Sequence, residues 1–165
     1  MGMQDYTIRP ARDTDIPEIL DLIHCLAEHE GAPKGVRATE ELLEAHLFTP
    51  LPVARVTVLQ EKGSERLAGF ALWFYKFSTW ESTPVIHMED LYVRAEHRGK
   101  GYGQALLSSL AAECVDRGYA RMEWNVSKDN DNGRAFYTKM GAGPLTDQEI
   151  FRLEGDALLR AGGRE

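Results

Sequence analysis

The segment RGKGYG at positions 98–103 holds three glycines between a strand-like run and a helix-like run. The strand-like run covers residues 85–93, and the helix-like run covers residues 104–117. Glycine lets the backbone approach a ligand closely, and the first turn of a helix presents unpaired N–H groups and the positive end of its dipole. A strand, a glycine-rich turn and a helix N-terminus together predict a site for a phosphate or pyrophosphate.

The glycine spacing separates this segment from two better-known phosphate loops. A P-loop needs four residues between its first glycine and a Gly-Lys-Ser/Thr triplet, and that spacing is absent. The dinucleotide fingerprint is Gly-x-Gly-x-x-Gly at the start of a βαβ unit, whereas this segment is Gly-x-Gly-x-Gly and lies late in the chain. A helix cap built from small residues is the alternative interpretation.

Length and composition are those of an ordinary globular protein. A chain of 165 residues predicts a single domain over 1–165 that can bury a core without disulfides. Hydrophobic residues make up 43% and charged residues 27% of the sequence. Since no apolar stretch is long enough to span a bilayer and no signal peptide is recognisable, we expect a cytoplasmic protein without a membrane partner.

The net charge of −7 argues against a nucleic-acid partner, which requires a basic surface. Against this acidic background Arg94, Arg98 and Lys100 stand near the glycines, offset only by Glu96. We expect these residues to form a local positive patch for an anionic ligand, while the acidic remainder suits a cationic substrate. A solvated loop with chance charges is the alternative.

Metal chemistry is not expected. Cys25 and Cys114 lie in amphipathic helical runs, where reduced cysteines packed in or near the core are the usual case. With the scattered histidines they form no metal-ligand cluster.

The hydrophobic pattern predicts a mixed α/β domain with an antiparallel first half. The expected strands cover residues 7–10, 53–59, 67–77, 85–93, 121–126 and 150–153. The expected helices cover residues 16–27, 39–47, 104–117 and 134–140.

Several segments resemble the GNAT superfamily of N-acetyltransferases, and the resemblance extends over nearly the whole chain. The matching motifs are MEDLYV at 88–93, the glycine loop, Asn130, AFY at 135–137 and GA at 141–142. Within the superfamily the chain looks closest to the diamine (spermidine/spermine) and thialysine acetyltransferases, whose tryptophan is matched by Trp80. The resemblance implies an α/β fold with a central, mostly antiparallel sheet, a splayed strand pair and flanking helices. It also implies a homodimer.

The cofactor implied by this resemblance is acetyl-CoA. In this family the strand before the loop splays at a bulge, so that backbone groups pair with the pantetheine arm. The residues expected to bind the cofactor are Leu91, Tyr92, Val93, Arg98, Gly99, Lys100, Gly101, Tyr102, Gly103, Asn130 and Tyr137.

The resemblance also implies the catalytic residues of an acetyl transfer by direct attack in a ternary complex. Glu89 would take a proton from the amine, and Tyr137 would protonate the departing thiolate. A carboxylate is a far weaker base than an amine, so this chemistry needs a water relay or a carboxyl group with a raised pKa. The alternatives are a surface carboxylate for Glu89 and core packing for Tyr137, although Phe136 can take that packing role. Asn130 would cap the helix of Tyr137.

The acceptor side is less defined by the motifs. Acidic and aromatic residues expected to line the entrance for a cationic amine are Glu28, Glu30, Trp80, Glu81, Glu89 and Asp90. Two departures from the polyamine enzymes, His29 for an aromatic residue and Ser78 for an acidic one, favour a small amine such as a diamine, thialysine, lysine or ornithine. A polyamine acetyltransferase, a protein N-acetyltransferase and a non-enzymatic acyl-CoA sensor are the alternatives.

Overall fold

The computed structural model describes residues 5–163, and the chain forms two compact units, Met1–Asn125 and Val126–Glu165. The first unit contains the whole sheet, and the second contains the helices α4 and α5. Within residues 5–163 no helix is long and apolar enough to cross a bilayer. The single domain over 1–165 stays a prediction.

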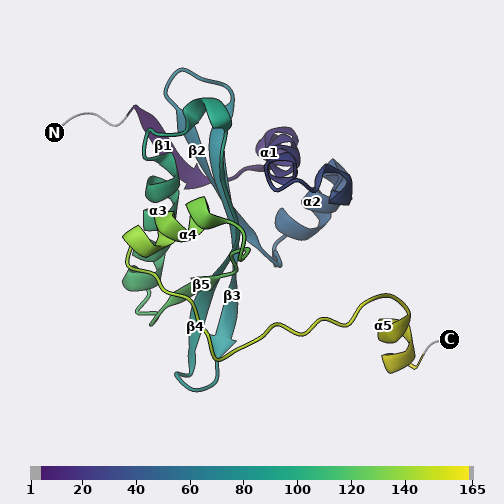
Figure 1. The fold of residues 1–165 in the computed structure, drawn as a ribbon. Coiled ribbons are helices and arrows are strands. Elements are labelled where there is room, and N and C mark those ends of the chain that lie inside the picture. Colours follow the sequence, from purple (N-terminus) through teal and green to yellow (C-terminus); the bar gives the residue numbers. More distant parts are fainter. Residues whose placement is uncertain (1–4, 164–165) are drawn as a thin grey trace. The chain divides into compact units, whose positions relative to one another are not determined.

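One five-stranded sheet forms the centre of the first unit, with the strands in their chain order (Figure 1). Neighbouring strands run antiparallel except for the last pair, which is parallel. This confirms the predicted mixed α/β fold with a mostly antiparallel sheet. The strands are β1 (Tyr6–Pro10), β2 (Arg55–Glu61), β3 (Leu67–Ser78), β4 (Thr83–Val93) and β5 (Met122–Trp124).

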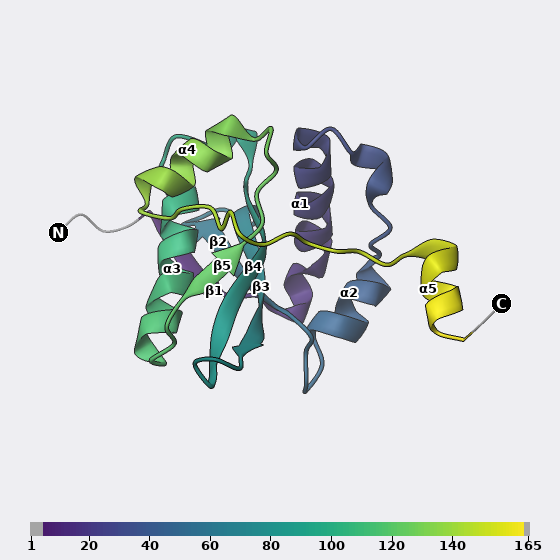
Figure 2. The ribbon, with the colours of Figure 1, turned by 60° about the horizontal axis from the view of Figure 1, so that its bottom comes forward.

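Helices cover both faces of this sheet. α1 (Ile16–His29) and α2 (Glu40–Leu47) lie on one side, and α3 (Tyr102–Asp116) lies on the other (Figures 1 and 2). Two buried clusters match this division. The first packs Ile19, Leu22, Leu43, Val58 and Phe70. The second packs Leu59, Ala68, Tyr102 and Leu106.

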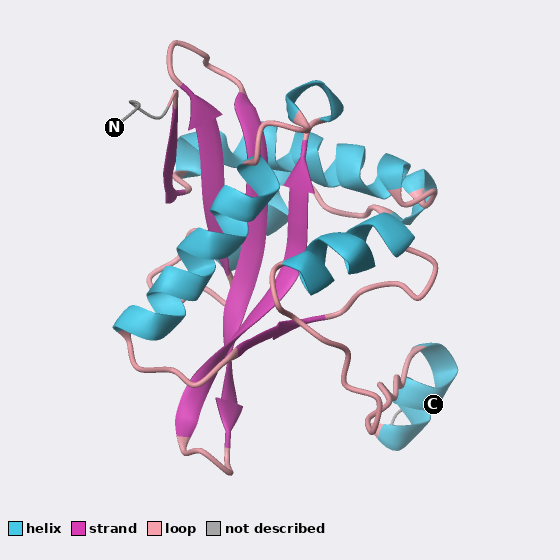
Figure 3. Cartoon of the chain, turned by 60° about the vertical axis from the view of Figure 1, so that its left-hand side comes forward, coloured by secondary structure: helices cyan, strands magenta, loops and turns pink. Residues whose placement is uncertain are grey.

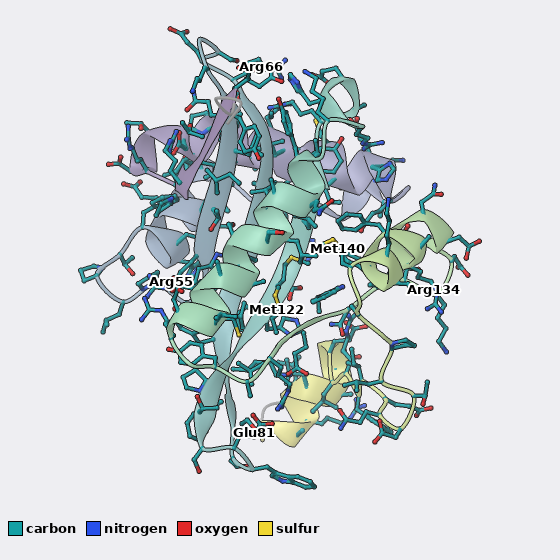
Figure 4. The ribbon with its side chains drawn as sticks, turned by 90° about the vertical axis from the view of Figure 1, so that its left-hand side faces the viewer. Arg55, Arg66, Glu81, Met122, Arg134 and Met140 are labelled. Atoms are coloured by element: carbon teal, nitrogen blue, oxygen red, sulfur yellow. The ribbon has the colours of Figure 1, made fainter. Side chains whose placement is uncertain are left out.

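β3 and β4 are the longest strands, and this hairpin extends from one end of the sheet to the other. Arg66, just before β3, and Glu81, in the turn after it, are at opposite ends of the sheet (Figure 4). Near the Arg66 end the two strands approach closely at Gly69, where an added Cβ would lie 2.7 Å from the carbonyl oxygen of Tyr92. A larger residue would therefore push the end of β4 away from β3.

The second unit differs from the sequence prediction. α4 (Asp131–Lys139) begins three residues before the expected 134, and α5 (Gly155–Ala161) was not predicted. The prediction of a strand at 150–153 is wrong, because these residues form a loop that pairs with no strand among residues 5–163 (Figure 3). Their apolar side chains are exposed, 74% for Ile150 and 91% for Phe151. A strand requires a partner strand, which the local pattern cannot supply.

Candidate active site

The glycine loop has the backbone geometry of an anion site. Gly99 and Gly101 have φ values of +77° and +81°, in the left-handed region that favours glycine. Gly101 is the N-cap of α3, which begins at Tyr102, and no side chain caps this helix end. A Cβ at Gly99 or Gly101 would meet nothing within 4 Å, so both glycines face open space. The first N–H groups of α3 are thus available to an anion.

A residue that sequence reasoning missed ties the loop to the sheet. Glu61, the last residue of β2, accepts hydrogen bonds from Lys100 Nζ and Tyr102 Oη at 2.7 Å each. His97 Nδ1 lies 3.2 Å from the same Glu61 oxygen. The bonds from Lys100 and Tyr102 lower the pKa of Glu61 to about 2, and Glu61 in turn raises the pKa of Tyr102 to about 12. No local pattern marks Glu61, because its partners lie about 40 residues away in the sequence.

The expected positive patch is smaller than the sequence indicated. Arg94 does not belong to it, because Arg94 is buried and makes ion pairs with Glu18 at 3.0 Å and Asp21 at 2.6 Å. Lys100 is paired with Glu61. Arg98 remains exposed, its Nε donating to the carbonyl of Val93 and its guanidinium lying 5.4 Å from the Tyr92 ring centroid.

β4 carries a bulge at the candidate base. Met88 pairs with Trp73 and Asp90 pairs with Leu72, so Glu89 is the extra residue between two pairs. A bulge bends the strand and changes the direction of its side chains. The side chain of Glu89 is 56% exposed.

The parallel pair β4–β5 separates at the same place. Its register ends at Met88 and Trp124, and beyond that point the β4 residues 89–93 pair with β3 alone among residues 5–163. The backbone of Leu91, Tyr92 and Val93 therefore has one edge without a strand partner, next to the glycine loop in sequence. Such an edge can accept an extended ligand as an added strand.

Three acidic residues gather at the bulge. Asp90 is half-buried, and its pKa is raised to about 6 by desolvation and then by the charges of Glu89 and Glu30. Glu30 follows the last residue of α1, and the ring of His29 lies 6.1 Å from that of Tyr92 on β4. The end of α1 thus brings Glu30 toward the two adjacent β4 carboxylates. A concentration of negative charge of this kind suits a cation.

The other expected acceptor residues lie elsewhere. Trp80 is 98% exposed in the β3–β4 turn. The first residue of β4, Thr83, follows this turn, and at ~3.3 Å per residue it lies about 20 Å along the strand from Glu89. Glu81, in the same turn, is paired with Arg121 at 2.6 Å. Glu28 is exposed on α1. Within one chain the structure brings together only Glu30, Glu89 and Asp90 of this group.

The remaining two candidates lie on α4 in the second unit. Asn130 is the N-cap of α4, and its Oδ1 accepts a 2.9 Å hydrogen bond from the Gly133 N–H. This confirms the predicted capping. Tyr137 is half-buried, and its ring contacts that of Phe136 edge-on at 5.1 Å between centroids.

Together these features define a class of protein. A mostly antiparallel sheet with a bulged, splayed strand, followed by a glycine-capped helix, is the architecture that the resemblance implied. The sequence profile of the acetyltransferase (GNAT) family matches residues 17–142. The chain belongs to this family and is a GNAT-type N-acetyltransferase.

Individual relatives agree with this assignment. The chain is 32% identical to the thialysine N-ε-acetyltransferase of Bos taurus, with 95% of this chain and 97% of that protein covered. It is 29% identical to the L-ornithine N5-acetyltransferase of Arabidopsis thaliana, with 92% and 85% covered. Among solved structures, an integron cassette protein from the mobile metagenome of V. cholerae has the same fold, with a TM-score of 0.80, 24% identity and coverage of 98% and 99%.

Proposed function

We propose that this protein transfers the acetyl group of acetyl-CoA to the amine of a small cationic acceptor, by direct attack in a ternary complex. The observation that carries the proposal is the acidic group of Glu30, Glu89 and Asp90 at the point where β4 bulges and leaves β5. This group would hold a cation beside the strand edge that receives the cofactor.

The residues of the loop fit a cofactor with a pyrophosphate. Gly99 and Gly101 leave open space in front of the N-terminus of α3, which no side chain caps, and Arg98 adds an exposed positive charge. On the edge of residues 91–93 that faces away from β3, the backbone groups of Leu91 and Val93 would pair with the amide groups of the pantetheine arm. When bound, acetyl-CoA supplies an activated thioester, and the remaining task of the protein is to position the amine and move protons.

Two residues, Glu89 and Tyr137, would carry out the proton transfers. Glu89 would accept the proton of the attacking ammonium, directly or through water, since its side chain is exposed. Asp90 is the carboxyl group with the raised pKa. When Asp90 is ionised, its negative charge would hold an ammonium group of the acceptor. Tyr137 would donate the proton that the leaving thiolate needs.

The acceptor class follows from charge and from the relatives. The carboxylates whose charges act on Asp90 are two, Glu89 and Glu30, and so small a number suits a short molecule with one or two positive charges better than a long polycation. The two relatives described above are named for thialysine and ornithine, which are both small amino acids with a side-chain amine.

We further propose that the chain forms a homodimer through its C-terminal segment, residues 145–159. Support comes from its apolar side chains, which are half to nine-tenths exposed, and from β-rich residues 150–153 that lack strand pairing in this chain. A second copy would cover these side chains and offer a strand partner. The exposed side chains are those of Leu145, Ile150, Phe151, Leu153, Leu158 and Leu159.

The test is a comparison of kcat/KM for acetyl-CoA consumption with thialysine, lysine, ornithine, putrescine and spermidine. We expect a small basic amine to be preferred. A preference for spermidine greater than about tenfold, or about 1.4 kcal/mol, would overturn the small-amine assignment. Acetylation of a protein amine and of no free amine would overturn the substrate class, and binding of acetyl-CoA without turnover of any amine would indicate a sensor.

A further inference from the structure

His87 is a buried titratable residue to which the proposed chemistry gives no role. It lies on β4 just before the bulge, and only 9% of its surface is exposed. Its Nε2 lies 3.6 Å from Glu89 Oε2. Its Nδ1 is buried and, in the part of the chain that the structure describes, has no hydrogen-bond partner.

The surroundings of His87 place two carboxylates near it. The ring packs 4.9 Å from that of Phe74, its partner on β3. On β5 it stands opposite Glu123, which accepts a 2.8 Å hydrogen bond from Lys76 and lies 3.9 Å from Arg121. Glu123 is therefore already paired with two cations, whereas Glu89 has its 3.6 Å contact with His87.

The contact with Glu89 favours one tautomer of a neutral His87 ring. An N–H on the nitrogen nearest a carboxylate is favourable, so the 3.6 Å contact favours the form with the proton on Nε2. The buried Nδ1 is then a bare lone pair. A buried polar atom without a partner costs stability, and a site that keeps such an atom requires an explanation.

We propose that His87 is a positioning residue for Glu89, whose Nε2–H holds the carboxylate in the orientation in which it takes the proton of the amine. The bulge makes this necessary, because Glu89 has no cross-strand partner and a long, exposed side chain with many rotamers. A donor fixed by burial and by Phe74 restricts that freedom. At 3.6 Å the contact is longer than a hydrogen bond, and we expect it to shorten to one when the acceptor binds. This inference rests on the proposed role of Glu89.

Two substitutions at His87 separate positioning from packing. His87→Phe keeps a ring against Phe74 and removes both nitrogens, including the unsatisfied one. We expect a melting temperature equal to or above that of the parent, and a kcat lower by roughly 10- to 100-fold with an unchanged KM for acetyl-CoA. His87→Gln keeps an N–H donor near the position of Nε2 and should recover most of the lost kcat. His24→Phe, at an exposed position on α1, is the control.

An activity-free measurement keeps this inference distinct from the proposed function. ¹⁵N NMR of the histidine side chains should show the Nε2–H tautomer of His87 in the parent protein and a changed tautomer ratio in Glu89→Gln, with little change in Glu123→Gln. Full kcat in His87→Phe, or a His87 tautomer ratio that is the same in the parent and in Glu89→Gln, would overturn the positioning role. A parent that acetylates no amine but shows the tautomer shift would overturn the proposed function and leave the His87–Glu89 contact standing.

Discussion

Lys100 Nζ donates a 2.7 Å hydrogen bond to Glu61 Oε1, which joins the glycine loop to the end of β2. Tyr102 donates to the same oxygen, so the residues on both sides of Gly101 share one acceptor. The loop's conformation thus depends on a residue some 40 positions earlier in the chain. Glu61 is consequently expected to control how well the loop receives a pyrophosphate.

Glu61→Gln should raise the KM for acetyl-CoA by about two- to fivefold, the worth of an exposed ion pair, without changing the KM for the amine. Steady-state kinetics with each substrate varied in turn measures this. Glu65→Gln, an exposed change in the adjacent turn, should change neither value. An unaltered KM for acetyl-CoA in Glu61→Gln would show that the loop keeps its shape without the pair.

Glu61 also makes a prediction about acid stability. Its pKa is lowered from an ordinary value near 4.5 to about 2, chiefly by Lys100 and Tyr102. A lowered folded-state pKa contributes stability above pH 4.5 that is lost as the pH falls toward 2. Between pH 6 and pH 3 the melting temperature should therefore fall more steeply for the parent than for Glu61→Gln. Parallel curves would contradict the pKa shift.

Gly101→Val should weaken acetyl-CoA binding strongly while the protein stays folded. The Cβ of valine would meet open space, so the cost comes from a β-branched residue at a φ of +81°, about 1–2 kcal/mol or a distorted loop. Gly101→Asn should be milder, because asparagine tolerates the left-handed region. Gly35→Val, at a glycine with ordinary φ and open surroundings, is the control. Calorimetry showing unchanged affinity in folded Gly101→Val would remove the pyrophosphate assignment.

Asp90→Asn should stabilise the protein at neutral pH and impair the reaction. Because the folded-state pKa of Asp90 is raised to about 6, the fold favours its protonated form, and that stability is lost as the pH rises through 6. Removing the charge should recover roughly 1–3 kcal/mol at pH 7. Asp116→Asn, an exposed change on α3, is the stability control.

The same substitution tests the role of Asp90 toward the amine. A contact made in both the ground state and the transition state should raise the KM for the amine more than it lowers kcat. In the parent, kcat/KM for the amine should fall below pH 6, as Asp90 becomes protonated. If Asp90→Asn instead abolishes kcat and Glu89→Gln leaves it intact, Asp90 is the base.

Tyr137→Phe should lower kcat by about 10²- to 10⁴-fold with little change in cofactor affinity, because only the hydroxyl is lost. The ring contact with Phe136 is preserved in this variant. Tyr119→Phe, whose ring packs against Tyr75 in the first unit, is the matched control. Near-normal turnover of Tyr137→Phe at saturating amine, with chemistry rate-limiting, would assign Tyr137 to packing.

Phe151→Asp should convert a dimer into a monomer, since it places a charge on the most exposed apolar side chain of residues 145–159. Sedimentation equilibrium of parent and variant measures this. Leu51→Asp removes a side chain that is 90% exposed in the first unit and should leave the dimer intact. A monomeric parent, or equal dissociation by Leu51→Asp, would overturn the proposed interface.

Local sequence determined most of the elements and the loop. Thr39 caps α2 through the N–H of Leu42, and Asn130 caps α4 through that of Gly133, as the residue types predict. The glycines between β4 and α3 predict a backbone that only glycine adopts easily, and Gly99 and Gly101 have positive φ values. These features depend on neighbours a few positions apart, so they can be read without the fold.

Only the tertiary structure decided which side chains meet. Arg94 adds no positive charge to the glycine loop, because it is buried and paired with Glu18 and Asp21. Glu61 lies at the loop, where it pairs with Lys100. The tertiary structure placed the bulge at Glu89 and moved Glu30 toward Asp90, where desolvation raises the pKa. The β-rich run 150–153 is no strand in this chain, since strand formation depends on a partner. Pairing, burial and charge proximity join residues that are distant in sequence, so local composition cannot specify them.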